Sequence, residues 1–137
     1  VRTLLDESGV LIKFEIVLEA RVEFDAPGAD DVVCGVATLS LRDLAASKLL
    51  ANADRWADDS VFSRDVIDLA MMNLPRPTLR RAVDKAQAAY GPAVVRDLAR
   101  AVGALKERRG RLEQCLAAMQ MTTPPALVWK RIKRLAS

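Results

Sequence analysis

Residues 41–72 of this 137-residue chain read LRDLAASKLLANADRWADDSVFSRDVIDLAMM, and the stretch has the pattern of two helices joined by a short polar loop. Leu and Ala, which favour helices, dominate its first half, and Ser40 just before it is a residue type that caps helix N-termini. We therefore expect one helix from Ser40 to about Trp56. A second should begin near residue 59 or 60 and run to about residue 73, closed by the pair Pro75 and Pro77.

The first of these helices carries charge where a core-facing stripe is expected. On a helical wheel that starts at Leu41, with about 100° per residue, the apolar stripe of the first half continues as Lys48, Asn52 and Arg55 in the second half. Lysine is rarely found on such a stripe unless it has a partner or an anionic ligand. This stripe is the most informative feature of the sequence.

The second helix repeats the pattern with the opposite sign. Asp65 and Asp68 are three residues apart and therefore lie one above the other, with Arg64 at the edge of the same face. Two antiparallel helices would bring Lys48 and Arg55 against this face and form a buried or half-buried ionic network. The network has two interpretations: it ties two helices together, or it belongs to a functional site. Since buried ion pairs are poor stabilisers, their presence calls for a reason such as specificity or a site.

Strands are expected only before residue 40. Within residues 9–24 the alternation is partial from Ile12 to Glu19, with Ile12, Phe14 and Ile16 on an apolar face. Residues 32–37 form a second short apolar run after the turn signal at 25–31. Two or three strands do not make a stable sheet by themselves, so something should cover or extend them.

The remainder of the chain is expected to be helical. Thr78 can cap a third helix that ends at Gly91, and a fourth begins at Pro92 and passes through or breaks at Gly110 before residue 121. Pro124 opens a last, short, basic helix. We therefore predict one α+β domain over residues 1–137, with short antiparallel strands in 1–39 and a lobe of about five helices in 40–137.

Composition excludes several classes of site. The chain has no histidine, and its two cysteines, Cys34 and Cys115, are far apart in sequence, so a zinc site, a Ser-His-Asp triad and a histidine base are not expected within it. Two buried free thiols in a cytoplasmic protein are favoured over a disulfide. The sequence has no apolar run of about 20 residues and no signal-peptide pattern, so we expect no contact with a membrane.

Charge is distributed unevenly between the two halves. Residues 1–75 carry 7 basic and 14 acidic side chains, whereas residues 76–137 carry 14 basic and 4 acidic ones. The cations concentrate in 106–111 and 130–134. They could form a nucleic-acid surface, but Trp129 is the one aromatic residue nearby and base stacking needs such residues. A solvated helix face is the alternative.

One family resemblance covers about thirty residues of the opening stretch. The order Lys48-Leu49, then Arg55, then Arg64-Asp65-Val66-Ile67-Asp68 is similar to the Lys-Leu…Arg…Asp-x-x-Asp signature of the AbiEii/AbiGii nucleotidyltransferases, the toxins of type IV toxin–antitoxin pairs. The resemblance implies that Lys48 contacts nucleotide phosphates, with Arg55 and Arg64 as supporting cations. It also implies that Asp65 and Asp68 support or take part in catalysis.

The sequence departs from the family pattern in one respect. Such enzymes carry a Gly-Ser followed about ten residues later by Asp-x-Asp, and this sequence contains neither. Glu15 could be a third, metal-binding carboxylate, although a solvated strand residue is the alternative. One carboxylate cannot hold two ions about 4 Å apart. Mg²⁺ is therefore expected only with further N-terminal carboxylates, and we expect the chain to be the C-terminal part of a larger nucleotidyltransferase fold, inactive alone.

Two functions follow. In the first, the chain supports binding of a nucleoside triphosphate, with RNA, tRNA in some family members, as a possible acceptor. In the second, it is a non-enzymatic interaction module that forms a homodimer through its strand edge or binds an antitoxin protein. A DNA-binding helical protein is a weaker third alternative because no helix-turn-helix pattern stands out.

Overall fold

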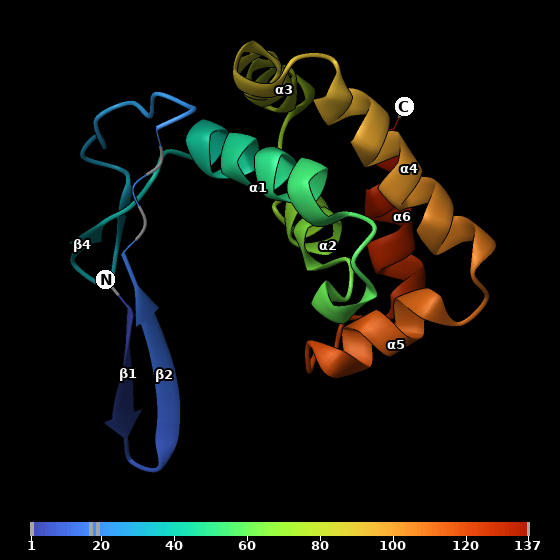
Figure 1. Ribbon diagram of the computed structural model, residues 1–137, viewed down its shortest axis with the longest axis horizontal. Helices are drawn as coiled ribbons and strands as arrows, with labels where there is room; N and C mark the ends of the chain where they lie inside the picture. The colour runs from blue at the N-terminus through green and yellow to red at the C-terminus, as the bar shows by residue number, and fades with distance from the viewer. Residues whose placement is uncertain (1, 17, 19, 137) are drawn as a thin grey trace.

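The computed structural model describes residues 2–16, 18 and 20–136 and places the strands before the helices, as the sequence predicts (Figure 1). The strands are β1 (Arg2–Glu7), β2 (Val10–Glu15), β3 (Val32–Val33) and β4 (Val36–Ala37). The helices are α1 (Leu41–Arg55), the 3₁₀ turn η1 (Asp59–Val61), α2 (Arg64–Met71), α3 (Arg76–Tyr90), α4 (Ala93–Glu107), α5 (Arg111–Ala118) and α6 (Pro125–Leu135). Two short antiparallel strand pairs followed by six α-helices in the described part confirm the predicted α+β class.

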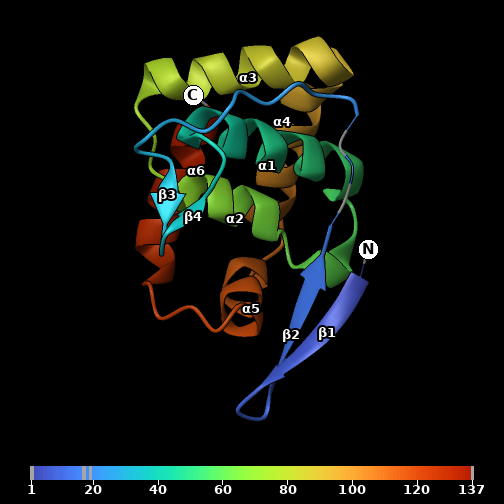
Figure 2. The same ribbon diagram turned by 90° about the vertical axis from the view of Figure 1, so that its left-hand side faces the viewer.

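Helix α1 lies at the centre of the helical lobe, between α3 and α2 (Figure 2). It also contacts α4, and α6 packs on α2. The fully buried side chains of greatest volume come from α1, α2, α4, α5 and α6. They are Leu49, Val66, Ile67, Leu69, Val94, Cys115, Val128 and Ile132, together with Asp43. The core is thus mostly aliphatic, as the composition predicts, and apart from Val22 and Leu74 its buried apolar residues belong to the helices.

The bounds of α1 agree with the prediction because its cap forms. The Ser40 hydroxyl accepts a hydrogen bond from the backbone N–H of Asp43 at 3.2 Å, which satisfies one of the free donors of the first turn. At the other end, Trp56 is the C-cap residue.

The predicted second helix is divided in two. The Asp58 carboxylate accepts hydrogen bonds from the backbone N–H and the hydroxyl of Ser60, and these fix the separate 3₁₀ turn η1. Phe62 and Ser63 then both adopt left-handed conformations, with φ of 53° and 49°, which a helix cannot contain. Helix α2 therefore starts at Arg64, four or five residues later than predicted.

The later helices follow the glycine and proline signals. Helix α3 begins two residues before Thr78, with Pro77 in its first turn, and ends at Gly91. The predicted alternative of a break at Gly110 is the one observed, because Gly110 has a φ of 76° and separates α4 from α5. None of the described helices is long and apolar enough to cross a membrane.

The strand region differs more from the prediction. Residues 32–37 are not one strand but a small hairpin, because Cys34 and Gly35 both have positive φ, the requirement of a two-residue hairpin turn. Cys34 is consequently exposed, which corrects the prediction of two buried thiols, and Cys115 alone is buried.

The first hairpin extends away from the helices (Figure 1). Its register pairs Thr3 with Phe14 and Leu5 with Ile12, so the predicted apolar face forms. That face is open: Ile12 and Phe14 are 46 % and 49 % exposed. The predicted strand also ends early, at Glu15 rather than near residue 19.

Candidate functional site

The charged stripes of α1 and α2 face each other, as the helical wheels predict. Arg55 and Lys48 of α1 meet Asp65 and Asp68 of α2 in two neighbouring ion pairs. Consecutive helices joined by a short connection bring the C-terminal half of α1 against α2, and so the spacing in sequence produces this contact. The network is half-buried: Asp65 is 3 % exposed, whereas the side chain of Asp68 is 36 % exposed.

Arg55 binds both carboxylate oxygens of Asp65 with one edge of its guanidinium. Its Nε lies 2.7 Å from Asp65 Oδ2 and its Nη2 lies 2.8 Å from Oδ1, a bidentate geometry that fixes both side chains. The hydrogen bond with Asp65 is the main reason that the pKa of Arg55 is raised, since burial acts in the opposite direction. Arg55 is therefore held as a permanent cation at the interface of the two helices.

Lys48 lies between the two carboxylates. Its Nζ is 2.5 Å from Asp68 Oδ2 and 3.9 Å from Asp65 Oδ1. The side chain is 29 % exposed, so one ammonium with three donors stands at the rim of the network and is reached by water. Such a group can exchange a carboxylate for another anion without leaving its position.

Asn52 lies on the same stripe, one turn from Lys48 and close to Arg55. The residue is 3 % exposed, and its amide nitrogen has no hydrogen-bond partner among residues 2–16, 18 and 20–136. A buried donor without a partner is uncommon in folded proteins.

The remaining two predicted site residues are placed differently. Arg64 opens α2 as an exposed residue and makes no hydrogen bond or ion pair with the part of the chain that the structure describes. Glu15 lies on β2, on the hairpin that extends away from the helices (Figure 1), and its carboxylate is 2.7 Å from the ammonium of Lys13. The structure therefore brings Lys48, Arg55, Asp65 and Asp68 together but does not bring Glu15 to them.

These carboxylates do not fit a Mg²⁺ site of the two-metal type. Asp65 and Asp68 are both engaged by cations at 2.5–2.8 Å, and a metal ion would have to displace Arg55 or Lys48. Over the described ranges, no group of three or more His, Cys, Asp or Glu side chains is arranged to hold a metal ion.

A second buried network was missed by the sequence analysis. Asp43 is completely buried and accepts hydrogen bonds from Lys85 Nζ at 2.6 Å and from the backbone N–H of Asp25 at 2.7 Å. Arg42 bridges Asp43 and Asp25. The network fastens the segment before α1 to α1 and α3. The sequence does show an acidic residue, Asp43, three residues after the N-cap Ser40. Its partner Lys85 lies 42 residues further along the chain, and no local pattern points to it.

Part of the basic C-terminal half is also neutralised internally. Arg108 forms a bidentate pair with Asp59 at 2.5 and 2.9 Å, and Arg111 donates to the backbone carbonyl of Asp59 at 2.8 Å. The hydrogen bond from Arg108 is the main cause that lowers the pKa of Asp59. The cluster at 106–111 is thus in part a structural link between η1 and the junction of α4 and α5.

Comparison with known proteins gives one match. The family model described as "Nucleotidyl transferase AbiEii toxin, Type IV TA system" matches residues 2–135. No curated protein and no solved structure matches this chain.

Proposed function

Because the chain belongs to the family of AbiEii nucleotidyl transferase toxins of type IV toxin–antitoxin systems, we propose that its α1–α2 pair binds the phosphates of a nucleoside triphosphate. Membership of this family implies a nucleotide substrate and an antitoxin partner in general. The proposal concerns which residues of this chain meet the nucleotide and what each contributes.

The position of Lys48 is the observation that carries the proposal. Its ammonium is held at the rim of the α1–α2 network, 2.5 Å from Asp68, and remains 29 % exposed. A triphosphate concentrates more negative charge than one carboxylate, so it can take the ammonium from the half-exposed Asp68. Binding would then break one ion pair and form a stronger one.

The neighbouring residues have supporting roles in this proposal. Asp65 is a positioning residue, because its bidentate contact fixes the Arg55 guanidinium beside Lys48. Arg64 is exposed at the start of α2 and can turn toward the same phosphates. In the Asp-x-x-Asp pattern, Asp68 is then the proposed catalytic carboxylate, and Asp65 supports the site through Arg55.

We propose binding without transfer by this chain alone. Nucleotidyl transfer needs carboxylates that hold two ions about 4 Å apart, and the sequence contains no Asp-x-Asp pair. Glu15 remains a proposed Mg²⁺ ligand, but the other ligands would have to come from outside the described residues. For an RNA acceptor, the exposed cations of α6, such as Lys130 and Lys133, are the proposed phosphate contacts.

Calorimetric titration of the chain with ATP, GTP, CTP and UTP in the presence of Mg²⁺ tests the proposal. At least one nucleotide should bind, and Lys48→Ala should weaken it about 10- to 100-fold, the effect of losing one charge-assisted hydrogen bond. Lys13→Ala, which removes a lysine from the exposed pair with Glu15, is the matched control and should leave affinity unchanged. The absence of heat with all four nucleotides would contradict the proposal.

The open hairpin supports a second candidate function, an interaction module that forms a homodimer through its strands or binds the antitoxin. Leu5, Ile12 and Phe14 share a face of the β1–β2 hairpin and are 46–51 % exposed. Two strands are at best marginally stable alone and gain from pairing with another strand. Sedimentation of the wild type against Ile12→Lys with Phe14→Lys tests it: a dimer that dissociates in the variant supports the module, and a monomeric wild type excludes self-association.

A further inference from the structure

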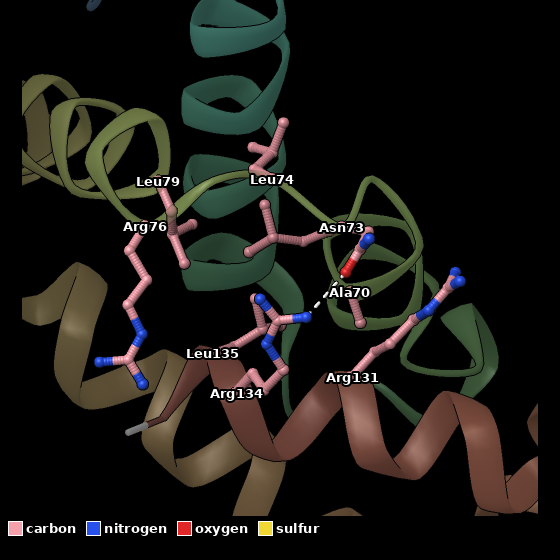
Figure 3. Close-up of a pocket in the computed structure, with 9 residues that line it drawn as sticks. Ala70, Asn73, Leu74, Arg76, Leu79, Arg131, Arg134 and Leu135 are labelled. Carbon is pink, nitrogen blue, oxygen red and sulfur yellow. Dashed lines mark hydrogen bonds between the residues drawn. The ribbon is translucent and has the colours of Figure 1, made fainter.

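A groove between α3 and α4, closed at one end by the last turn of α6, lies outside the network just described. Its volume is about 870 Å³, within the range of ligand-binding clefts, and it is open to solvent. A smaller cavity of about 20 Å³ adjoins it at the junction of α2, α3 and α6 (Figure 3). None of the residues in the α1–α2 ionic network lines either of them.

The rim of the groove is strongly cationic. Arg76, Arg80 and Arg81 come from α3, and Arg134 comes from α6, where it donates to Asn73 Oδ1 at 2.9 Å (Figure 3). The three guanidiniums of α3 form no hydrogen bond or ion pair with any residue that the structure describes. This differs from Arg108, the residue that follows α4, which is neutralised by the Asp59 carboxylate within the chain.

The floor of the groove is aliphatic. Leu79 and Val83 of α3 face Val95 and Leu98 of α4 across it, and Val95 is 44 % exposed. The spacings of four residues on α3 and three on α4 are those of one helical face, so two apolar stripes run along the groove. Among the described residues that line the groove, none is aromatic.

We propose that this groove binds an acidic amphipathic helix of a partner protein. Such a helix lays an apolar face between two helices and presents Glu and Asp to the rim, and therefore uses both the aliphatic floor and the unneutralised arginines. The described residues that line the groove include one carboxylate, Asp84, and four arginines, so the charge complementarity favours an acidic ligand.

The same chemistry argues against a nucleic acid as the occupant. Phosphates pair with arginine as well as carboxylates do. Single-stranded bases, however, stack on aromatic side chains, and none of the described residues that line the groove is aromatic. A duplex contacts proteins mainly through its phosphates and would leave the aliphatic floor without a role.

The probe for the test is a labelled synthetic peptide of about 18 residues, five helical turns, with Leu at helical spacing and Glu and Ala elsewhere. A scrambled peptide of the same composition and labelled single-stranded and duplex RNAs are titrated in parallel by fluorescence anisotropy. The variants are Arg80→Glu with Arg81→Glu for the rim and Val95→Asp for the floor. Lys106→Glu with Arg109→Glu, two exposed cations outside the groove, is the control of equal charge change.

The proposal predicts that the amphipathic peptide binds the wild type and the control, and that the scrambled peptide does not. Rim and floor variants should each weaken binding about tenfold or more. Circular dichroism shows whether each variant is folded, and one folded variant of the two is enough for the test. Failure of the peptide to bind, or binding that neither variant weakens, overturns the proposal. So does RNA binding that the rim variant weakens and Val95→Asp leaves unchanged, because the groove would then be a phosphate surface.

Discussion

The guanidinium of Arg55 forms two hydrogen bonds, 2.7 and 2.8 Å long, to the carboxylate of Asp65, ten residues further along the chain. This pair links the end of α1 to the start of α2 across the 3₁₀ turn and the two left-handed residues that separate them. It also sets the position of Lys48, whose ammonium lies 3.9 Å from the same carboxylate.

Arg55→Ala should destabilise the protein, because it leaves Asp65 buried without its main partner. We expect a loss of about 2–3 kcal/mol in the free energy of unfolding, since removing one member of a buried pair costs more than the pair contributes. Urea denaturation measures it. The double variant Arg55→Met with Asp65→Leu should lose less than the single one, and an unfolding free energy equal to that of the wild type in Arg55→Ala would contradict the assignment.

The buried Asp43 network should be as important for stability as the site itself. Asp43→Ala removes the acceptor of Lys85 and of the Asp25 backbone N–H, and we expect a loss of about 3 kcal/mol. Hydrogen exchange should also show faster exchange at the Asp25 amide, because the segment before α1 is released. Unchanged exchange at that amide would mean that other contacts hold the segment.

These two networks illustrate what the sequence could predict. Ser40 and the helical pattern after it predict α1 to within a residue, and the spacing of Lys48, Arg55, Asp65 and Asp68 predicts which side chains meet. The cap contact lies within one helical turn, and helix geometry fixes which of the charged side chains share a face. The short connection between α1 and α2 then brings the two charged faces together. The roles of these residues toward a nucleotide remain predictions.

Other features depend on contacts that no local pattern reveals. Lys85 reaches Asp43 from 42 residues away, and only the packing of α3 on α1 brings them together. Likewise, Phe62 and Ser63 adopt left-handed conformations in a stretch whose pattern favours a continuous helix, because tertiary packing overrides propensity.

Asp97 should make stability depend on pH. Hydrogen bonds from Arg96, and then the charges of Arg96 and Arg100, lower the pKa of Asp97 in the folded state below its unfolded value of about 3.9. Its contribution is therefore complete above about pH 4 and is lost as the pH falls through the lower folded pKa. The difference in unfolding free energy between the wild type and Asp97→Asn should shrink as the pH is lowered from about 5 to 2. A constant difference over this range would show that the ion pairs contribute nothing.

The two thiols should react at very different rates. Cys34 is exposed in the β3–β4 turn, whereas burial raises the pKa of Cys115, so that thiol has little thiolate and little access. Titration of the native protein with a thiol-reactive dye should show one fast group, which Cys34→Ser removes, and a second group only on unfolding. Two fast thiols in the native protein would contradict the burial of Cys115.

The central claim is that Lys48 exchanges Asp68 for the phosphates of a nucleotide. The most direct measurement is calorimetric titration of Asp68→Asn with the nucleotide that binds the wild type. Since this substitution removes the competing charge and leaves Lys48 in place, the account predicts that the nucleotide binds about three- to tenfold more tightly. Weaker or unchanged binding would contradict it, because Lys48 would then not be shared between the carboxylate and the ligand.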